Sequence, residues 1–326
     1  MKDKVGSEKT QATLGRILSS GLSLVIMLLW LAGCSSAQEM AHHHTESAAD
    51  PDVMQDWAKA RLAKSPRHQE WVKVKNGNRE VNCFVVYPEV KNKATAVVVI
   101  HEIFGMSDWV QALTDELAEA GYLAIAPDLL SGMGPKGGGT YEIAATGSNA
   151  VGQAIRDLPP DQITADLNAV ADYVSKLPAA NGKVAVGGFC WGGSQTFRFA
   201  TNRPSLKAAF AFYGSAPATG QPPAQVTDKE ALKRISAPVY GFYAENDARI
   251  DATLPATTDA MKELGKKYDP VIYAGAGHGF MRAGEAPEPT AKGDKDADEK
   301  ALTAYKANKK AREDAWARWK TLLAAL

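Results

Sequence analysis

The chain has few of the residues that build disulfide frameworks, and it has no charge excess that would attract a polyanion. Its 326 residues include three cysteines, Cys34, Cys83 and Cys190, which are too few for a disulfide scaffold. Basic and acidic residues number 37 each, so the formal net charge is zero. A nucleic-acid binder is expected to carry a basic patch, and this balance argues against one. The hydrophobic content of 45% instead indicates a globular protein with a substantial core.

The N-terminal residues are typical of an export signal. A segment with four basic residues precedes an apolar run over residues 17–31, which is short for a membrane-spanning helix. The run ends in Leu-Ala-Gly-Cys at 31–34, which resembles the lipobox of bacterial lipoproteins. In that family cleavage falls before the cysteine, whose sulfur then carries lipid. We therefore expect residues 1–33 to be a signal peptide and Cys34 to be a lipidated first residue, with an uncleaved anchor as the alternative.

The lipobox resemblance also predicts where the protein resides. It implies an exported protein that is held at the bacterial membrane by lipid alone and faces the periplasm. Ser35 rather than aspartate follows Cys34, which favours the outer membrane. Residues 34–53 are small and polar and are expected to form a flexible tether. The run His42–His44 lies in this tether without a carboxylate or cysteine placed to complete a rigid metal site, so no metal is expected there.

Strand and helix signals alternate along residues 54–326, the expected catalytic domain. Asn76-Gly77-Asn78 between two apolar runs predicts a hairpin, and the β-branched run 95–101 predicts a strand buried on both faces. Residues 131–160 are rich in glycine and proline and are expected to form a loop or lid. A helix is expected to begin at Ser194. The alternation predicts an α/β fold with a mostly parallel central sheet and helices on both faces.

The stretch Gly188-Phe189-Cys190-Trp191-Gly192 has the pattern of a nucleophile elbow, with cysteine where serine is usual. A strand that turns sharply into a helix holds the nucleophile in a strained backbone conformation. Side chains two residues to either side would collide, which explains the glycines. The N-terminus of the following helix favours negative charge at the nucleophile. The alternative is a glycine-rich turn that holds a buried, inert cysteine.

A cysteine nucleophile needs a base, and the chain has six histidines to choose from. Residues 42–44 lie in the expected tether and His68 precedes the first strand, which leaves His101 and His278. His278 follows the last expected strand in a glycine-rich loop, at the sheet edge where catalytic groups of open α/β sheets gather. His278 is therefore the predicted base.

The acid that orients the base is expected between the nucleophile and the histidine in the sequence. Asp247 follows the expected strand 238–244 and is the predicted acid. Glu245 and Asp251 lie close by, and spacing does not exclude either of them.

Residues 101–105, His-Glu-Ile-Phe-Gly, end the third expected strand. In this fold that position supplies one backbone N–H of the oxyanion hole, and the residue after the nucleophile supplies the other. The predicted donors are the N–H groups of Ile103 and Trp191.

Four separated motifs together resemble the dienelactone hydrolase family, and the resemblance spans roughly residues 70–325. They are His-Glu-Ile-Phe-Gly at 101–105, Gly-Phe-Cys-Trp-Gly-Gly at 188–193, Asp247 after a strand, and Gly-His-Gly-Phe at 277–280. The resemblance implies an α/β-hydrolase fold in which Cys190, Asp247 and His278 form the triad. It also implies that Glu102 accepts a hydrogen bond from the resting thiol and that Arg282 holds a substrate carboxylate.

One departure from the family concerns the substrate. Members that open dienelactone carry a second substrate arginine after an Asp-Leu pair, and residues 128–132, Asp-Leu-Leu-Ser-Gly, contain none. The case for dienelactone itself is weaker as a result, and the hydrolase chemistry is unaffected.

The implied activity is hydrolysis of an ester or lactone through an acyl-enzyme on Cys190 that His278 and water release. No metal or organic cofactor is needed. The expected partners are the small-molecule substrate and, through the lipid alone, a membrane. Phe104, Trp191 and Tyr213 are expected either to line the pocket or to pack in the core. A non-catalytic ligand-binding lipoprotein on the same fold is the alternative, since a fold alone proves no activity.

Overall fold

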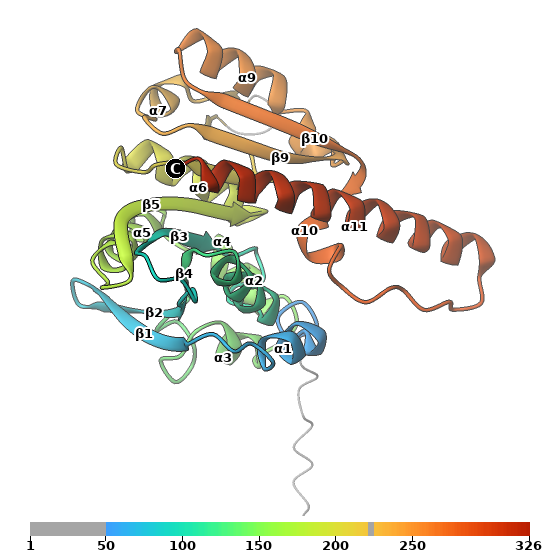
Figure 1. Cartoon of the computed structure of the whole chain (residues 1–326). Helices are drawn as coiled ribbons and strands as arrows, with labels where there is room; N and C mark the ends of the chain where they lie inside the picture. The colour runs from blue at the N-terminus through green and yellow to red at the C-terminus, as the bar shows by residue number, and fades with distance from the viewer. Residues whose placement is uncertain (1–49, 221–224) are drawn as a thin grey trace, which may run out of the picture. The chain divides into compact units, whose positions relative to one another are not determined.

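The described residues, 50–220 and 225–326, build an eight-stranded sheet in this computed structural model (Figure 1). The strand order is β1-β2-β4-β3-β5-β6-β9-β10; β1 pairs antiparallel with β2, β2 pairs antiparallel with β4, and the other neighbours are parallel. The predicted fold class is confirmed. The strands are β1 (Gln69–Asn76), β2 (Arg79–Val86), β3 (Ala94–Ile100), β4 (Leu123–Pro127), β5 (Ala180–Phe189), β6 (Ala209–Phe212), β9 (Val239–Asn246) and β10 (Tyr268–Gly277).

Helices cover both faces of the sheet. They are α1 (Asp56–Leu62), α2 (Asp108–Glu119), α5 (Pro160–Ser175), α6 (Trp191–Asn202), α8 (Ala248–Asp251), α9 (Leu254–Glu263), α10 (Phe280–Ala283) and α11 (Lys295–Ala324). The insertion after β6 adds a two-stranded sheet, β7 (Ala218–Thr219) with β8 (Val226–Thr227), and helix α7 (Lys229–Lys233). No helix in residues 50–220 and 225–326 is both long and apolar enough to cross a membrane.

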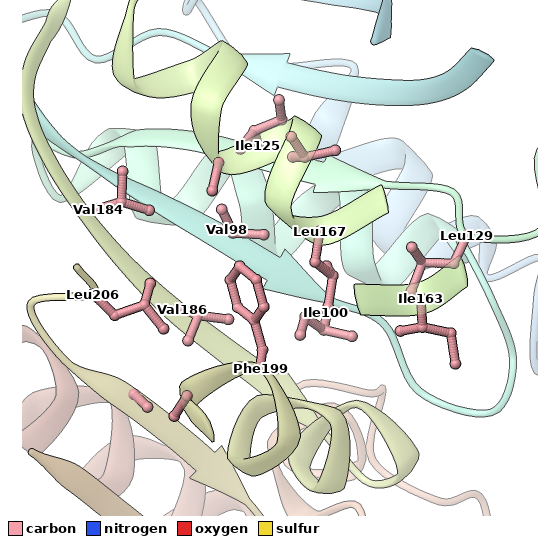
Figure 2. Packing of buried hydrophobic residues seen from close by; sticks show 14 of the residues in the cluster. Val98, Ile100, Ile125, Leu129, Ile163, Leu167, Val184, Val186, Phe199 and Leu206 are labelled. Carbon is pink, nitrogen blue, oxygen red and sulfur yellow. The ribbon is translucent and has the colours of Figure 1, made fainter. Parts of the chain in front are cut away.

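Side chains of the central strands divide between two hydrophobic cores, because successive residues of a strand point to opposite faces. Val98 and Ile100 of β3 belong to the core under α5 and α6, which Figure 2 shows together with Leu167 and Phe199. Val97 and its neighbour on that face of β3, Val99, belong to the other core, which includes residues of α2 and α11. The continuous apolar run of β3 follows from burial on both faces.

The long helix α11 packs closely against the strand that carries Cys190. Trp319 of α11 is fully buried, and a Cβ placed on Gly187 of β5 would lie 2.6 Å from its indole ring. The same indole contacts Phe189, with ring centroids 5.9 Å apart, and Phe212 at 4.9 Å. A glycine at 187 therefore allows the helix to approach the sheet directly beneath the elbow.

Three local expectations differ from the structure. The expected loop 131–160 contains two short helices, α3 (Thr140–Ala144) and α4 (Ala150–Arg156). Helix α6 begins at Trp191, before the expected Ser194, because the chain turns immediately after Cys190. The folded part begins before the expected residue 54: Val53 is fully buried, and its carbonyl accepts a hydrogen bond of 3.0 Å from the Asp108 N–H. Cys34 and the run 42–44 lie outside the described residues.

Candidate active site

Three strand ends carry the predicted triad residues. Cys190 follows the last residue of β5, Asp247 follows that of β9, and His278 follows that of β10. These strands are parallel and lie in the order β5-β6-β9-β10, so their carboxyl ends meet at one edge of the sheet.

Cys190 occupies a strained turn that requires the surrounding glycines. Its φ is 55° and its ψ is −117°, a region that residues with side chains rarely adopt. A Cβ on Gly188 would lie 2.2 Å from the Gly192 carbonyl oxygen, and a Cβ on Gly192 would lie 2.4 Å from the Ile100 carbonyl oxygen. The sequence pattern of the elbow thus corresponds to backbone segments that approach too closely for any side chain.

The thiol of Cys190 is held in its neutral form. Burial, and secondarily the negative charge of Glu102, raise the pKa of the Cys190 thiol to about 11. The backbone N–H groups of Trp191 and Ile103 and the more distant charge of Arg249 act in the opposite direction and lower this pKa. The two N–H groups that affect the sulfur are the predicted oxyanion donors.

The structure brings one of the three carboxylates near the end of β9 to His278. Asp247 is largely buried, and its Oδ2 lies 2.5 Å from Nδ1 of His278. Glu245 is exposed and accepts a hydrogen bond of 2.7 Å from the Gly275 N–H. Burial raises the pKa of Asp251, as do the negative charges of Asp247 and Glu245. Asp247 is therefore the carboxylate that can orient the imidazole.

Glu102 is bound by residues other than the nucleophile. Nε of Arg282 donates a hydrogen bond of 2.7 Å to Oε2 of Glu102, and the Tyr213 hydroxyl donates one of 3.4 Å to Oε1. Within the described chain the Cys190 thiol forms no hydrogen bond to Glu102, although the resemblance implies one. Burial alone would lower the pKa of the Arg282 guanidinium, but Glu102 and, more weakly, Asp52 raise it above its ordinary value. Arg282 therefore serves here as the partner of Glu102.

The three aromatic residues with open roles take different positions. Tyr213 is fully buried with a φ of 38°; its ring packs 5.1 Å from that of His278, so it supports the site from within the core. Phe104 is half-buried, and the Arg282 guanidinium lies 4.7 Å above its ring. Trp191 is half-buried and packs against the core beneath α5 and α6. Tyr213 is therefore a core residue, whereas Phe104 and Trp191 are partly exposed residues next to the site.

His101, the histidine that was not predicted to be the base, lies next to the site. Its Nδ1 lies 2.8 Å from the Glu102 carbonyl oxygen, and its ring stacks on that of Trp191 with centroids 5.4 Å apart. Burial lowers the pKa of this histidine, so it is neutral and Nδ1–H can donate to the carbonyl. The peptide it holds is the one that carries the Ile103 N–H. In the sequence, this role of His101 is indicated only by its position as the first residue of the segment 101–105.

No group of three or more His, Cys, Asp or Glu side chains in residues 50–220 and 225–326 is arranged to hold a metal ion.

Comparison with known proteins now identifies the family. The sequence profile of the dienelactone hydrolase family matches residues 81–326. The chain belongs to the dienelactone hydrolase family. A Salmonella typhi protein named as a carboxymethylenebutenolidase is 32% identical over 185 residues, which are 56% of this chain and 67% of the relative. One from Saccharolobus solfataricus is 29% identical over 273 residues, 75% of this chain and 93% of the relative.

Solved structures agree with the family. A Klebsiella pneumoniae protein named as a dienelactone hydrolase matches with a TM-score of 0.64 and 25% identity, covering 80% of this chain and 99% of the other. A dienelactone hydrolase-like promiscuous phosphotriesterase from metagenomic libraries matches with a TM-score of 0.60 and 21% identity, which supports the fold alone. The predicted α/β-hydrolase fold is confirmed, and this dienelactone hydrolase family member is a hydrolase.

Proposed function

We propose that this hydrolase cleaves esters or lactones by acyl transfer to Cys190, with His278 as the base and Asp247 as its orienting acid. The observation that carries the proposal is the 2.5 Å contact of His278 Nδ1 with Asp247 at the sheet edge that also presents Cys190 in a strained elbow. Nδ1 is engaged by the carboxylate, so Nε2 is the nitrogen left to exchange a proton with thiol, leaving group and water.

In the first half-reaction the Cys190 proton moves to Nε2 of His278 as sulfur attacks the carbonyl carbon. A carbon–sulfur bond forms and the carbonyl electron pair moves to oxygen, where the Ile103 and Trp191 N–H groups stabilise the oxyanion. The carbonyl then re-forms, the carbon–oxygen bond to the leaving group breaks, and that oxygen takes the proton from His278. The product is a thioester on Cys190 and an alcohol, which in a lactone remains part of the acyl group.

In the second half-reaction water is the nucleophile. His278 removes a proton from water as the water oxygen attacks the thioester carbon, and the same N–H groups stabilise the second oxyanion. The carbon–sulfur bond breaks and the sulfur recovers the proton from His278. A carboxylic acid leaves, and the free thiol is restored. Substrate, water and the chain's own groups supply every atom of this scheme.

The direct test is turnover of p-nitrophenyl acetate and a panel of small lactones by the purified protein and by Cys190→Ala. The proposal expects hydrolysis by the parent and none above background by the variant. Turnover that survives Cys190→Ala would overturn the role of the cysteine. Saturable binding without turnover would instead indicate the non-catalytic ligand-binding alternative.

We also propose that the protein is a lipoprotein, exported to the periplasm and held at a membrane through Cys34, with the outer membrane favoured by Ser35. The support is the Leu-Ala-Gly-Cys sequence at 31–34 after a basic and apolar segment. Intact mass and detergent partitioning of the protein produced in a bacterium test it. Cys34→Ala is expected to abolish lipidation, and a protein whose partitioning does not change with this substitution would contradict the proposal.

A further inference from the structure

Arg282 is surrounded on several sides at the edge of the site. Its Nε donates to Glu102 at 2.7 Å, its Nη1 lies 3.5 Å from Oδ1 of Asp52, and its guanidinium covers the ring of Phe104. One cation therefore meets two carboxylates. A substrate carboxylate that approached Arg282 would enter a position that Asp52 already occupies.

Asp52 is held there by the docking of residues 50–55 on the domain. The buried Val53 accepts a hydrogen bond of 3.0 Å from the Asp108 N–H, and the Gln55 N–H donates to the Asp108 carboxylate at 2.9 Å. Gln55 Oε1 in turn accepts a hydrogen bond from the Trp109 N–H at 2.9 Å. These contacts use groups other than the Asp52 side chain, so its carboxylate can be changed without removing them.

The negative charges of Glu102 and Asp52 disfavour a substrate that carries a carboxylate. Glu102 is buried beside the thiol and already disfavours negative charge on Cys190. A carboxylate-bearing substrate would add charge next to Glu102 and Asp52, and it would have to displace Asp52 to contact Nη1 of Arg282. The positive charge of Arg249 lowers the pKa of Cys190, but Arg249 is exposed, so solvent screens it.

We propose that Asp52 takes the place of a substrate carboxylate on Arg282, so that the site selects uncharged esters and lactones over carboxylate-bearing ones. This inference rests on the proposed ester and lactone hydrolysis and names its substrate class. Asp52 acts as a specificity-determining residue by satisfying Arg282 and by repelling an acidic group. Its side chain is 48% exposed, so a variant with no charge there should admit the acidic group readily.

The test compares a matched pair of esters, p-nitrophenyl butyrate and p-nitrophenyl hemisuccinate, which differ mainly in the carboxylate of the acyl chain. The parent is expected to prefer the butyrate in kcat/KM. Asp52→Asn should raise kcat/KM for the hemisuccinate relative to the butyrate about twofold to fivefold, mainly through a lower KM, the range for a partly exposed charge pair. The preference is the ratio of kcat/KM for the two esters within each protein, so a change in activity common to both esters does not affect the comparison.

Asp56→Asn is the control, because Asp56 is an exposed carboxylate four residues away on α1 and its loss changes the net charge equally. It should leave the preference between the two esters unchanged. A parent that prefers the hemisuccinate, or an Asp52→Asn variant with the parent's preference, would overturn the inference and leave the proposed hydrolysis intact. A parent that hydrolyses neither ester would overturn both.

Discussion

Nε of Arg282 donates a 2.7 Å hydrogen bond to Oε2 of Glu102, and this pair joins two segments that are 180 residues apart. The bond turns one oxygen of Glu102 towards Arg282, while the carboxylate charge stays close enough to raise the pKa of Cys190. Charge and burial thus keep the resting thiol neutral, although within the described residues it forms no hydrogen bond to Glu102. In the oxidising compartment to which we propose the protein is exported, a neutral thiol resists oxidation better than a thiolate.

The effect of Glu102 on the thiol can be measured by alkylation. In the parent, the rate of Cys190 modification by iodoacetamide should be slow near pH 7 and should climb until about pH 11, because the thiolate is the reactive form. Glu102→Gln removes a charge that raises the pKa of Cys190 and leaves Arg282 with Asp52 as its remaining carboxylate contact in the described residues, so the curve should move to lower pH. Each unit of that shift gives ~10-fold faster modification near neutral pH, while turnover falls.

Cys83 must be replaced by Ser in both proteins, and Cys34 must be lipidated or absent, so that Cys190 alone is followed. Rapid alkylation of the parent below about pH 6, under the ordinary thiol value of about 8.5, and unaltered by Glu102→Gln, would show that Glu102 does not govern the thiol.

Cys190→Ala and His278→Ala should each abolish hydrolysis and leave the thermal unfolding transition close to that of the parent. The double variant should be little worse than either single one, because residues of a triad act as a unit. Residual kcat/KM of the three proteins on p-nitrophenyl acetate provides the measurement. Independent losses that multiply in the double variant would show that the two residues serve different steps.

Asp247→Asn should reduce kcat by about 10³-fold or more, because the imidazole loses the carboxylate that fixes its tautomer and stabilises its charged form. Glu245→Gln and Asp251→Asn are the matched controls and should stay near the parent value. The assignment of the acid is wrong if either control is the sensitive position.

His101 should act as a positioning residue for the oxyanion hole. His101→Phe keeps a ring against Trp191 but loses the Nδ1–H that holds the Glu102 carbonyl, so the adjoining Ile103 N–H is less well aimed. We expect kcat to fall about 10-fold with KM little changed, less than the loss from removing an oxyanion donor outright. His101→Asn, which places an amide N–H near the position of Nδ1, should recover part of kcat. Equal losses of kcat in His101→Phe and His101→Asn would indicate that His101 contributes through packing alone.

Trp319→Ala should destabilise the fold by about 3–5 kcal/mol, the usual range for deleting a fully buried tryptophan. The indole fills the space over Gly187 and packs against the rings of Phe189 and Phe212. Urea unfolding gives the free energy. Trp71→Ala is the control, because Trp71 is 49% exposed on β1 and its loss should cost far less. Similar losses in both variants would mean that α11 does not support the sheet as described.

The sequence predicted those features of the site that depend on local geometry. The glycines around Cys190 follow from the turn itself, and strand ends placed Asp247 and His278 at one sheet edge. Spacing did not separate Asp247 from Glu245 and Asp251, because the direction of each side chain is set by how the chain turns after β9.

Sequence patterns did not predict the contacts between segments that are far apart in the chain. The contact of Asp52 with Arg282 joins residues 230 positions apart, and no local propensity encodes it. The family resemblance implies that Glu102 binds the thiol, and no sequence pattern indicates that Arg282 donates to Oε2 of Glu102. The short helices α3 and α4 were missed because glycine-rich flanks resemble those of a loop.

The packing of Trp319 beneath Phe189 also sets an order of events during synthesis. The two residues are 130 positions apart, so at ribosomal speeds of ~5–20 residues per second the indole is made roughly 7 to 26 seconds after the elbow. Until then this face of the sheet is covered by α2 but lacks the part of its cover that α11 supplies. Cys190 is therefore synthesised well before α11, and the packing beneath its strand is complete only after α11 has been made.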